Sequence, residues 1–119
     1  MESRAIQEKE RIVRARGEID LSNVDGFQAE LEDAVRESPH GFVIDLSGVT
    51  YMDSAGVQAV LWAYRSVLDA GGRLALVITH PNVQEIFVII GAERLPDFCI
   101  CDNIESAVKS ISTASAGKG

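Results

Sequence analysis

The sequence predicts an α/β fold, with a mixed or mostly parallel sheet of four to five strands and about four helices packed on it. Short apolar runs rich in β-branched residues alternate with longer segments in which apolar residues recur every three to four positions. Turn and capping residues separate the two kinds of segment. At 119 residues the chain suits a single domain, which we place at residues 1–111, followed by a flexible polar tail at residues 112–119.

The first part of the chain predicts an edge of the sheet followed by a helix. Residues 6–19 alternate apolar and charged side chains, which indicates one or two strands with a turn near Gly17. Residues 20–23 contain helix-start residues, and Pro39 marks the end of the helix. The apolar stripe of this helix consists of Phe27, Leu31, Ala34 and Val35.

A central strand and helix come next. The apolar run at residues 42–46 is short and β-branched, as expected of a strand buried on both faces of a parallel sheet. Asp53 or Ser54 then caps a helix, which Gly71 and Gly72 end. The apolar face of this helix consists of Val57, Val60, Leu61, Tyr64 and Leu68.

Two more strand–helix units complete the pattern. Residues 73–78 predict a buried strand, and Pro81 opens a helix that ends at Gly91. Residues 98–101 predict a last short strand, and Asp102 and Asn103 start a final helix.

Composition narrows the possible partners. The formal net charge of −7 and the pI of about 4.7 disfavour nucleic acid or an anionic membrane and favour a partner with a basic face, although acidity also serves solubility alone. Residues 2–11 are rich in charge, so we expect no signal peptide, and no apolar run approaches the ~18 residues of a membrane span. We therefore expect Cys99 and Cys101 to be free thiols in a reducing cytoplasm. No further Cys or His lies at the spacing of a zinc site, so we expect no zinc there.

Catalytic motifs are lacking in the sequence. The two histidines, His40 and His80, lie in predicted turns, and neither can be joined to Ser54 as a catalytic base. There is no Gly-x-Ser-x-Gly elbow, no phosphate-binding loop and no dinucleotide fingerprint. We therefore expect no enzyme, no cofactor and no metal; a hydrolase using Ser54 is the weaker alternative.

Ser54 is the strongest candidate for a modification site. It lies where a buried strand meets a helix N-terminus, and a phosphate is tolerated there by the helix dipole and the free N–H groups. A phosphate would also place about −1.5 to −2 charges beside Asp53. The alternative is that Asp53 and Ser54 do no more than cap the helix, and spacing alone favours that simpler role.

The polar side of the same helix suggests a docking surface. Ser54, Gln58 and Trp62 recur at intervals of four, on the side opposite the apolar face. Tryptophan is enriched among interface anchors. A Trp62 partly covered by neighbouring side chains is the alternative.

Residues 43–56 read Val-Ile-Asp-Leu-Ser-Gly-Val-Thr-Tyr-Met-Asp-Ser-Ala-Gly, which resembles the signature of STAS domains. The stretch is most similar to that of stand-alone bacterial anti-sigma-factor antagonists. Weaker similarities at residues 17–20, 72–77 and 105–107 extend the resemblance over nearly the whole chain. The resemblance implies a STAS-like domain, and the Asp-Ser-x-Gly core in its Asp-Leu-Ser-Gly-Val frame is its most specific part.

The resemblance implies a regulator of transcription that works by partner switching. Such proteins bind an anti-sigma factor, often a serine kinase of the histidine-kinase-like ATPase fold, and so free a sigma factor. The kinase phosphorylates the serine that matches Ser54, which breaks the complex, and a phosphoserine phosphatase restores it. The family also includes regulatory modules of transporters and of stressosome complexes, which remain the alternative. A further alternative is a regulatory module of a transport system that responds to a small molecule or a nucleotide.

The expected partner-binding site combines both lines of reasoning. Many family members carry Ser or Thr where this chain has Ala55, so only one hydroxyl is available here. Asp20 and Asp53 match acidic positions near the family serine. The expected partner-binding residues are Asp20, Asp53, Ser54, Ala55, Gly56, Gln58 and Trp62.

Overall fold

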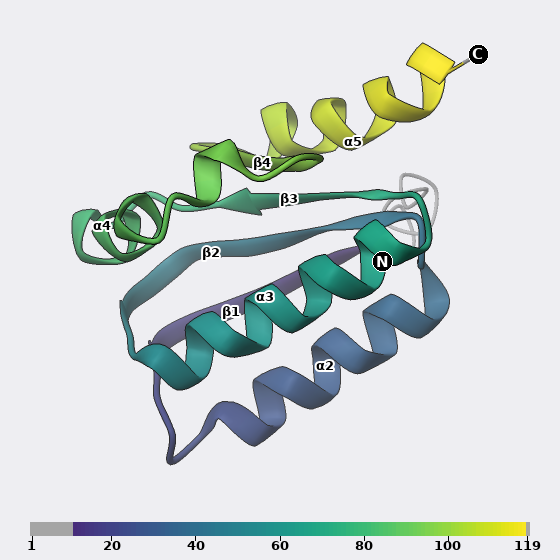
Figure 1. Cartoon of the computed structure of the whole chain (residues 1–119). Helices are drawn as coiled ribbons and strands as arrows, with labels where there is room; N and C mark the ends of the chain where they lie inside the picture. The colour runs from purple at the N-terminus through teal and green to yellow at the C-terminus, as the bar shows by residue number, and fades with distance from the viewer. Residues whose placement is uncertain (1–10, 119) are drawn as a thin grey trace, which may run out of the picture.

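A computed structural model describes residues 11–118, with side chains as far as Ser112. Figure 1 shows a sheet whose strands lie in chain order, β1-β2-β3-β4, and every neighbouring pair within the described residues is parallel. The strands are β1 (Ile12–Ile19), β2 (Gly41–Met52), β3 (Arg73–Val77) and β4 (Phe98–Cys101). The helices are α2 (Val24–Glu37), α3 (Ser54–Asp69), α4 (Pro81–Ile89) and α5 (Ile104–Lys118), with a short 3-10 helix η1 (Ala92–Arg94). The predicted α/β class and number of strands are confirmed.

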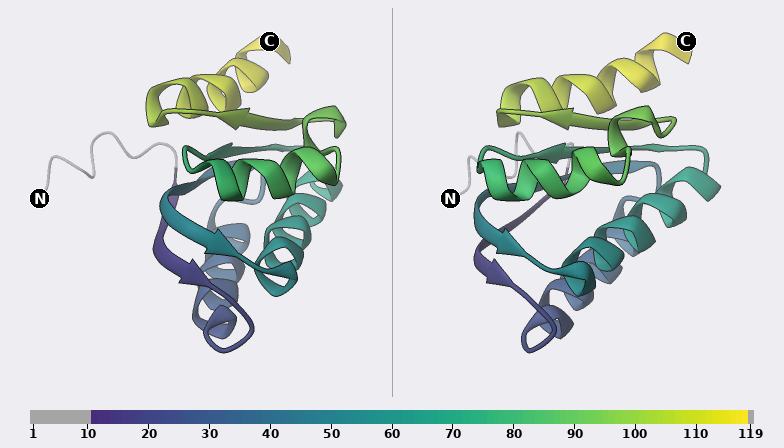
Figure 2. Two further views of the ribbon diagram at one scale, coloured as in Figure 1. Left: turned by 90° about the vertical axis from the view of Figure 1, so that its left-hand side faces the viewer. Right: turned by 60° about the vertical axis from the view of Figure 1, so that its left-hand side comes forward.

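The helices cover the two faces of the sheet unequally. Side chains of α2, α3 and α4 share one large core with Phe42, Ile44 and Leu46 of β2. A smaller core on the opposite face joins Val43 of β2 to α5. Figures 1 and 2 show α5 on its own side of the sheet, away from α2 and α3. The prediction that residues 42–46 are buried on both faces is confirmed, because all five are buried.

The expected turn near Gly17 is wrong. Gly17 lies inside β1, with a φ of +81°, at one of two irregularities in the register between β1 and β2. The left-handed backbone, which glycine adopts readily, here accommodates a bulge that bends the strand instead of reversing it. Any further strand in residues 6–10 lies outside the described residues.

The last helix is longer than expected. α5 continues to Lys118, so the segment expected as a tail is helical over residues 112–118. The flexibility of that tail stays a prediction. None of the helices within residues 11–118 has the length and apolar character needed to cross a membrane.

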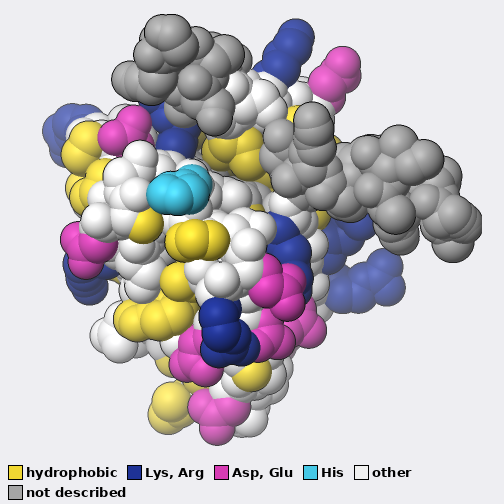
Figure 3. Space-filling model, turned by 90° about the vertical axis from the view of Figure 1, so that its right-hand side faces the viewer, with side chains coloured by type: hydrophobic (Ala, Val, Ile, Leu, Met, Phe, Trp, Pro, Cys, Tyr) yellow, Lys and Arg dark blue, Asp and Glu magenta, His cyan; other side chains and the backbone are white. Residues whose placement is uncertain are grey.

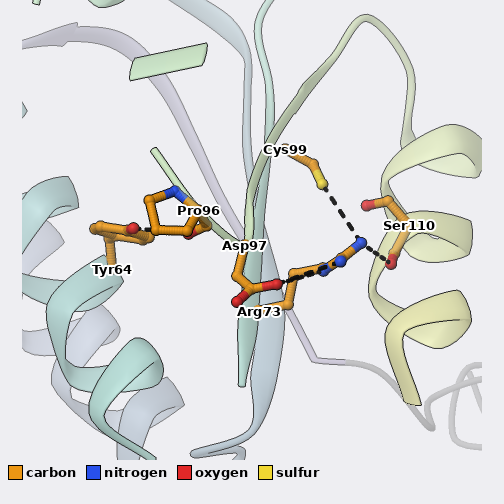
Figure 4. Close-up of polar contacts among 6 residues, drawn as sticks. All are labelled: Tyr64, Arg73, Pro96, Asp97, Cys99 and Ser110. Carbon is orange, nitrogen blue, oxygen red and sulfur yellow. Dashed lines mark hydrogen bonds and ion pairs between the residues drawn. The ribbon is translucent and has the colours of Figure 1, made fainter. Parts of the chain in front are cut away.

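Polar contacts hold the corner between β3, β4 and α5, as Figure 4 shows. At the start of β3, Arg73 donates to the Asp97 carboxylate from Nε and Nη2, both at 3.3 Å, and to the Ser110 carbonyl at 3.3 Å. The Cys99 sulfur lies 4.0 Å from the same guanidinium, and its thiol and that of Cys101 are both free. One side chain thus links the loop before β4 to the helix after it.

The end of the molecule that carries the amino ends of the strands is shown in Figure 3. Acidic and basic side chains are intermixed over much of this face. Ion pairs near the end of α2 join Arg11 to Glu37 and Arg36 to Asp33. Exposed pairs of this kind contribute little to stability, about 0–1 kcal/mol each. The carboxyl ends of the strands, at the opposite end of the molecule, carry the site described next.

Candidate functional site

The junction between β2 and α3 places Ser54 at the surface. β2 ends at Met52, Asp53 has an extended backbone, and Ser54 is the first residue of α3. This junction lies at the carboxyl edge of the parallel sheet, where α/β folds usually carry their functional groups. The side chain of Ser54 is exposed, and its hydroxyl has no hydrogen bond within the part of the chain that the structure describes.

The helix cap is Asp53, which settles the choice between Asp53 and Ser54. Its Oδ1 accepts hydrogen bonds from the backbone N–H groups of Ala55 (2.9 Å) and Gly56 (3.3 Å). Its Oδ2 accepts from the backbone N–H of Leu21 at 3.1 Å. The carboxylate therefore caps α3 and also ties the start of this helix to the loop between β1 and α2.

Asp20 belongs to that same loop. Its Oδ1 accepts from the backbone N–H of Ser22 (3.0 Å) and from the Ser22 hydroxyl (2.6 Å). Asn23 closes the loop, because its Oδ1 accepts from the Asp20 N–H (3.0 Å) and its Nδ2 donates to the Glu18 carbonyl (2.9 Å). These bonds give Asp20 a structural role in shaping the loop beside the α3 cap.

Leu21 is a residue that the sequence analysis missed. The loop holds its side chain 77% exposed, next to the start of α3. An apolar residue between two loop-forming polar residues, Asp20 and Ser22, was the available signal. That signal does not show that Leu21 lies next to α3, because its hydrogen-bond partner Asp53 is 32 positions further along the chain.

A groove runs between α2 and α3, which Figure 1 shows side by side. Its volume is ≈ 370 Å³. Ser54 and Gln58 are exposed along α3, as predicted. Trp62 is 37% exposed, so it reaches the surface while neighbouring side chains cover most of it, which agrees with the alternative of a partly covered Trp62. Gln58 and Trp62 line the groove together with Ala55, whereas Ser54 lies just beyond its end. The lining residues are Leu21, Val24, Asp25, Gln28, Ala55, Gln58, Ala59 and Trp62.

Gly56 lies beneath this surface. A Cβ at this position would lie 2.6 Å from the Cγ of Met52 and 3.1 Å from the Cγ2 of Ile19. Gly56 is buried, and the missing side chain lets α3 approach the ends of β1 and β2 closely. It positions the exposed residues of the helix without reaching the surface itself.

The two histidines lie apart from Ser54. His40 is exposed in the turn before β2. His80 is more than a solvated loop residue, because its Nδ1 accepts from the Asn82 N–H at 3.2 Å and caps α4. Neither is hydrogen-bonded to the Ser54 hydroxyl, and the described residues contain no group of three or more His, Cys, Asp or Glu side chains suited to a metal.

Known proteins resemble the chain over most of its length. BtrV of Bordetella bronchiseptica, a candidate anti-sigma factor antagonist, is 31% identical over 98 residues, which cover 82% of this chain and 83% of BtrV. The crystal structure of an anti-sigma factor antagonist from Mycobacterium paratuberculosis has a TM-score of 0.75 at 22% identity, covering 85% of this chain and 84% of that one. The structure of the anti-sigma factor antagonist SpoIIAA in its unphosphorylated form has a TM-score of 0.61 at 21% identity, covering 91% and 88%.

The two solved structures support the fold, and the sequence match supports the family. The model of the STAS domain family matches residues 3–110, a span that contains the β2–α3 junction, the loop with Leu21 and the groove. The chain therefore belongs to the STAS domain family.

Proposed function

We propose that the protein is an anti-sigma-factor antagonist, which binds an anti-sigma factor and thereby frees a sigma factor, and that phosphorylation of Ser54 switches it off. The observation that carries the proposal is the exposed Ser54 hydroxyl, which has no hydrogen bond within residues 11–118 and stands at the start of a helix beside a docking groove. BtrV and both solved structures are described as anti-sigma factor antagonists, and the description of SpoIIAA names an unphosphorylated form.

The chemistry of the junction suits a switch of this kind. A phosphate on Ser54 lies at a helix N-terminus, where the helix dipole favours negative charge, so α3 stays folded. The N–H groups of Ala55 and Gly56 stay bonded to the Asp53 carboxylate. The phosphate adds about −1.5 to −2 charges next to the Asp53 carboxylate. A partner fitted to the neutral hydroxyl then meets both added bulk and an added negative charge at the edge of its contact.

The partner in this proposal is an anti-sigma factor that is also a serine kinase of the histidine-kinase-like ATPase fold, and a phosphoserine phosphatase reverses the modification. The acidic balance of the chain, with a net charge of −7, favours a partner with a basic face and disfavours direct contact with nucleic acid. The protein itself acts by binding, in the cytoplasm, and catalyses no reaction.

The contact surface in this proposal centres on Ser54, Ala55, Gln58 and Trp62. These four residues lie on the accessible side of α3, and the last three line the groove toward α2. Asp20, Asp53 and Gly56 contribute from behind, since the first two use their carboxylates to hold the loop and the cap, and Gly56 is buried.

A kinase assay tests the switch. The purified protein is incubated with ATP and each candidate serine kinase from its own genome, and the phosphate is mapped by mass spectrometry. We expect modification at Ser54. Calorimetric titration with the same kinase should show binding of wild type and Ser54→Ala with similar affinity, and at least about tenfold weaker binding of Ser54→Asp.

The matched variant Ser54→Ala also tests the structural role of the hydroxyl. Because Asp53 supplies the helix cap, the free energy of unfolding of the Ser54→Ala variant should stay within about 0.5 kcal/mol of the wild-type value. A phosphate found at another residue, or a Ser54→Asp variant that binds as tightly as wild type, would contradict the proposal.

A further inference from the structure

Leu21 combines a highly exposed side chain with a backbone that is held by hydrogen bonds. Its side chain is 77% exposed, the highest exposure among the large hydrophobic side chains of the described residues. Its backbone is nevertheless firmly held, because its N–H donates to Asp53 and both neighbouring residues are hydrogen-bonded within the loop. Single exposed apolar side chains are common on protein surfaces. At Leu21, however, the backbone is held in place before any partner arrives, which lowers the entropic cost of a contact there.

The surroundings of Leu21 form a surface for an apolar contact. Leu21 and Trp62 both line the groove between α2 and α3, one from the loop before α2 and the other from α3. Val24, Ala55 and Ala59 add apolar lining to the groove. Tryptophan is enriched among the residues that supply most of the binding energy of protein interfaces, and an exposed leucine beside it adds apolar area that a partner can bury.

The charges at this surface indicate the occupant. Asp25 lines the groove, the Asp53 carboxylate is hydrogen-bonded to the lining residue Leu21, and none of the lining residues is Lys or Arg. A second copy of this chain would bring the same carboxylates against these, so self-association here is disfavoured. A partner with apolar side chains flanked by a basic group fits the groove, and its contact would continue onto Ser54.

We infer that Leu21 is an apolar anchor for the anti-sigma factor, and that Asp53 is the positioning residue that presents it. The inference rests on the function proposed above and extends its contact surface from α3 onto the loop before α2. The occupant is a surface of the anti-sigma factor with a pocket for Leu21 and a basic side chain directed at Asp25. The Asp53 carboxylate then has two tasks, because it starts the helix that carries Ser54 and fixes the loop that carries the anchor.

Binding to the anti-sigma factor identified in the kinase assay tests the anchor. Leu21→Ala should weaken binding at least about tenfold, as expected when a leucine side chain that is buried in a contact is truncated. Ile89→Ala is the matched control, since Ile89 is 73% exposed on α4 and lines no part of the groove. We expect the control to bind within about twofold of wild type. Both side chains are exposed, so neither change should unfold the domain.

A second variant tests the role of Asp53. Asp53→Asn keeps one oxygen for the N–H groups of α3 but places an amide nitrogen toward the Leu21 N–H, where no hydrogen bond can form. Amide exchange at Leu21 should become faster, while exchange along α3 changes little. Asp53→Asn should weaken binding on its own but add little in the Leu21→Ala background, because both changes remove the same contact.

The outcomes separate the two proposals. Full-strength binding by Leu21→Ala, or equal losses for Leu21→Ala and Ile89→Ala, would overturn the anchor while leaving the proposed function in place. Additive losses for the two changes would overturn the positioning role of Asp53. If wild type binds none of the candidate anti-sigma factors, the proposed function fails and the anchor fails with it.

Discussion

Hydrogen bonds tie α3 to two different loops, one near the surface of the protein and one in its core. Near the start of α3, the half-buried Asp53 carboxylate accepts from the Leu21 backbone. About three turns later, the buried Tyr64 hydroxyl donates to the Pro96 carbonyl at 2.7 Å (Figure 4). The Tyr64 ring lies 4.8 Å from the ring of Phe98. The first contact leaves apolar and hydroxyl side chains exposed beside it, whereas the second sits within the main core.

Along this one helix, the buried Tyr64 contact supports the stability of the fold, and the surface contact of Asp53 positions residues that a partner would meet. The Tyr64 contact combines ring packing, burial and a hydrogen bond, so its loss should be felt throughout the fold. The Asp53 contact sits at the surface and shapes what a partner meets. Changes near Tyr64 should therefore alter unfolding, and changes near Asp53 should alter binding more than unfolding.

The largest expected effect is that of Tyr64→Ala. Removing a buried aromatic ring that packs on Phe98 should lower the free energy of unfolding by about 3–5 kcal/mol. Chemical denaturation followed by circular dichroism measures the change. A loss below about 1 kcal/mol would mean that the core around α3 repacks freely, and the contrast between the two contacts would disappear.

An intermediate effect is expected at the start of the helix, from Gly56→Ala. The added methyl group would lie 2.6 Å from the Cγ of Met52, which is buried, so the strand or the helix must shift. We expect a loss of about 1–3 kcal/mol, measured in the same denaturation experiment.

The control for Gly56→Ala is Gly26→Ala in α2. No atom lies within 4 Å of the added methyl group there, so the change should stabilise the helix by about 0.5–1 kcal/mol. Equal effects at the two glycines would contradict the close approach of α3 to the strand ends.

The smallest effect is that of Tyr64→Phe, and it should depend on pH. The variant keeps the ring but loses the hydrogen bond to Pro96, at a cost of about 1 kcal/mol near neutral pH. Burial, with a smaller contribution from the charge of Asp97, raises the pKa of the Tyr64 phenol. The folded protein then holds this proton to higher pH than the unfolded chain, so stability falls as the pH rises above about 10.

Tyr64→Phe lacks that titrating group, so the stability advantage of wild type over the variant should shrink between about pH 9 and pH 11. Urea denaturation of both proteins across that range measures the difference. An advantage that stays constant or grows with pH would contradict the raised pKa of Tyr64.

Much of the fold could be predicted because its signals are local. Periods of two and of about 3.6 identified the strands and helices, and the exposed series Ser54, Gln58 and Trp62 followed from helical geometry alone. The turn expected at Gly17 was wrong because a positive φ serves a bulge as well as a turn, and only the pairing with β2 decides between them.

The site was predicted in part, for the same reason. Ser54 and its helix are contiguous in the chain, so the junction could be found from the sequence. The bond from Leu21 to Asp53 and the groove between α2 and α3 join segments that are far apart in the chain. No local pattern carries that information, and an exposed leucine in a polar loop has no meaning until its neighbours in space are known.

The order of the strands has a consequence for how the domain is made. Each strand pairs with the one that precedes it in the chain, so every new strand–helix unit can dock on structure that already exists as the chain leaves the ribosome. The smaller core is different, because α5 follows all four strands in the chain. The residues of that core on β2 and β3 are covered only when α5 packs on them; they are Val43, Ala75 and Val77. Until α5 has been synthesised, one apolar face of the sheet lacks its cover, and this face is where a nascent chain is most open to chaperones or to aggregation.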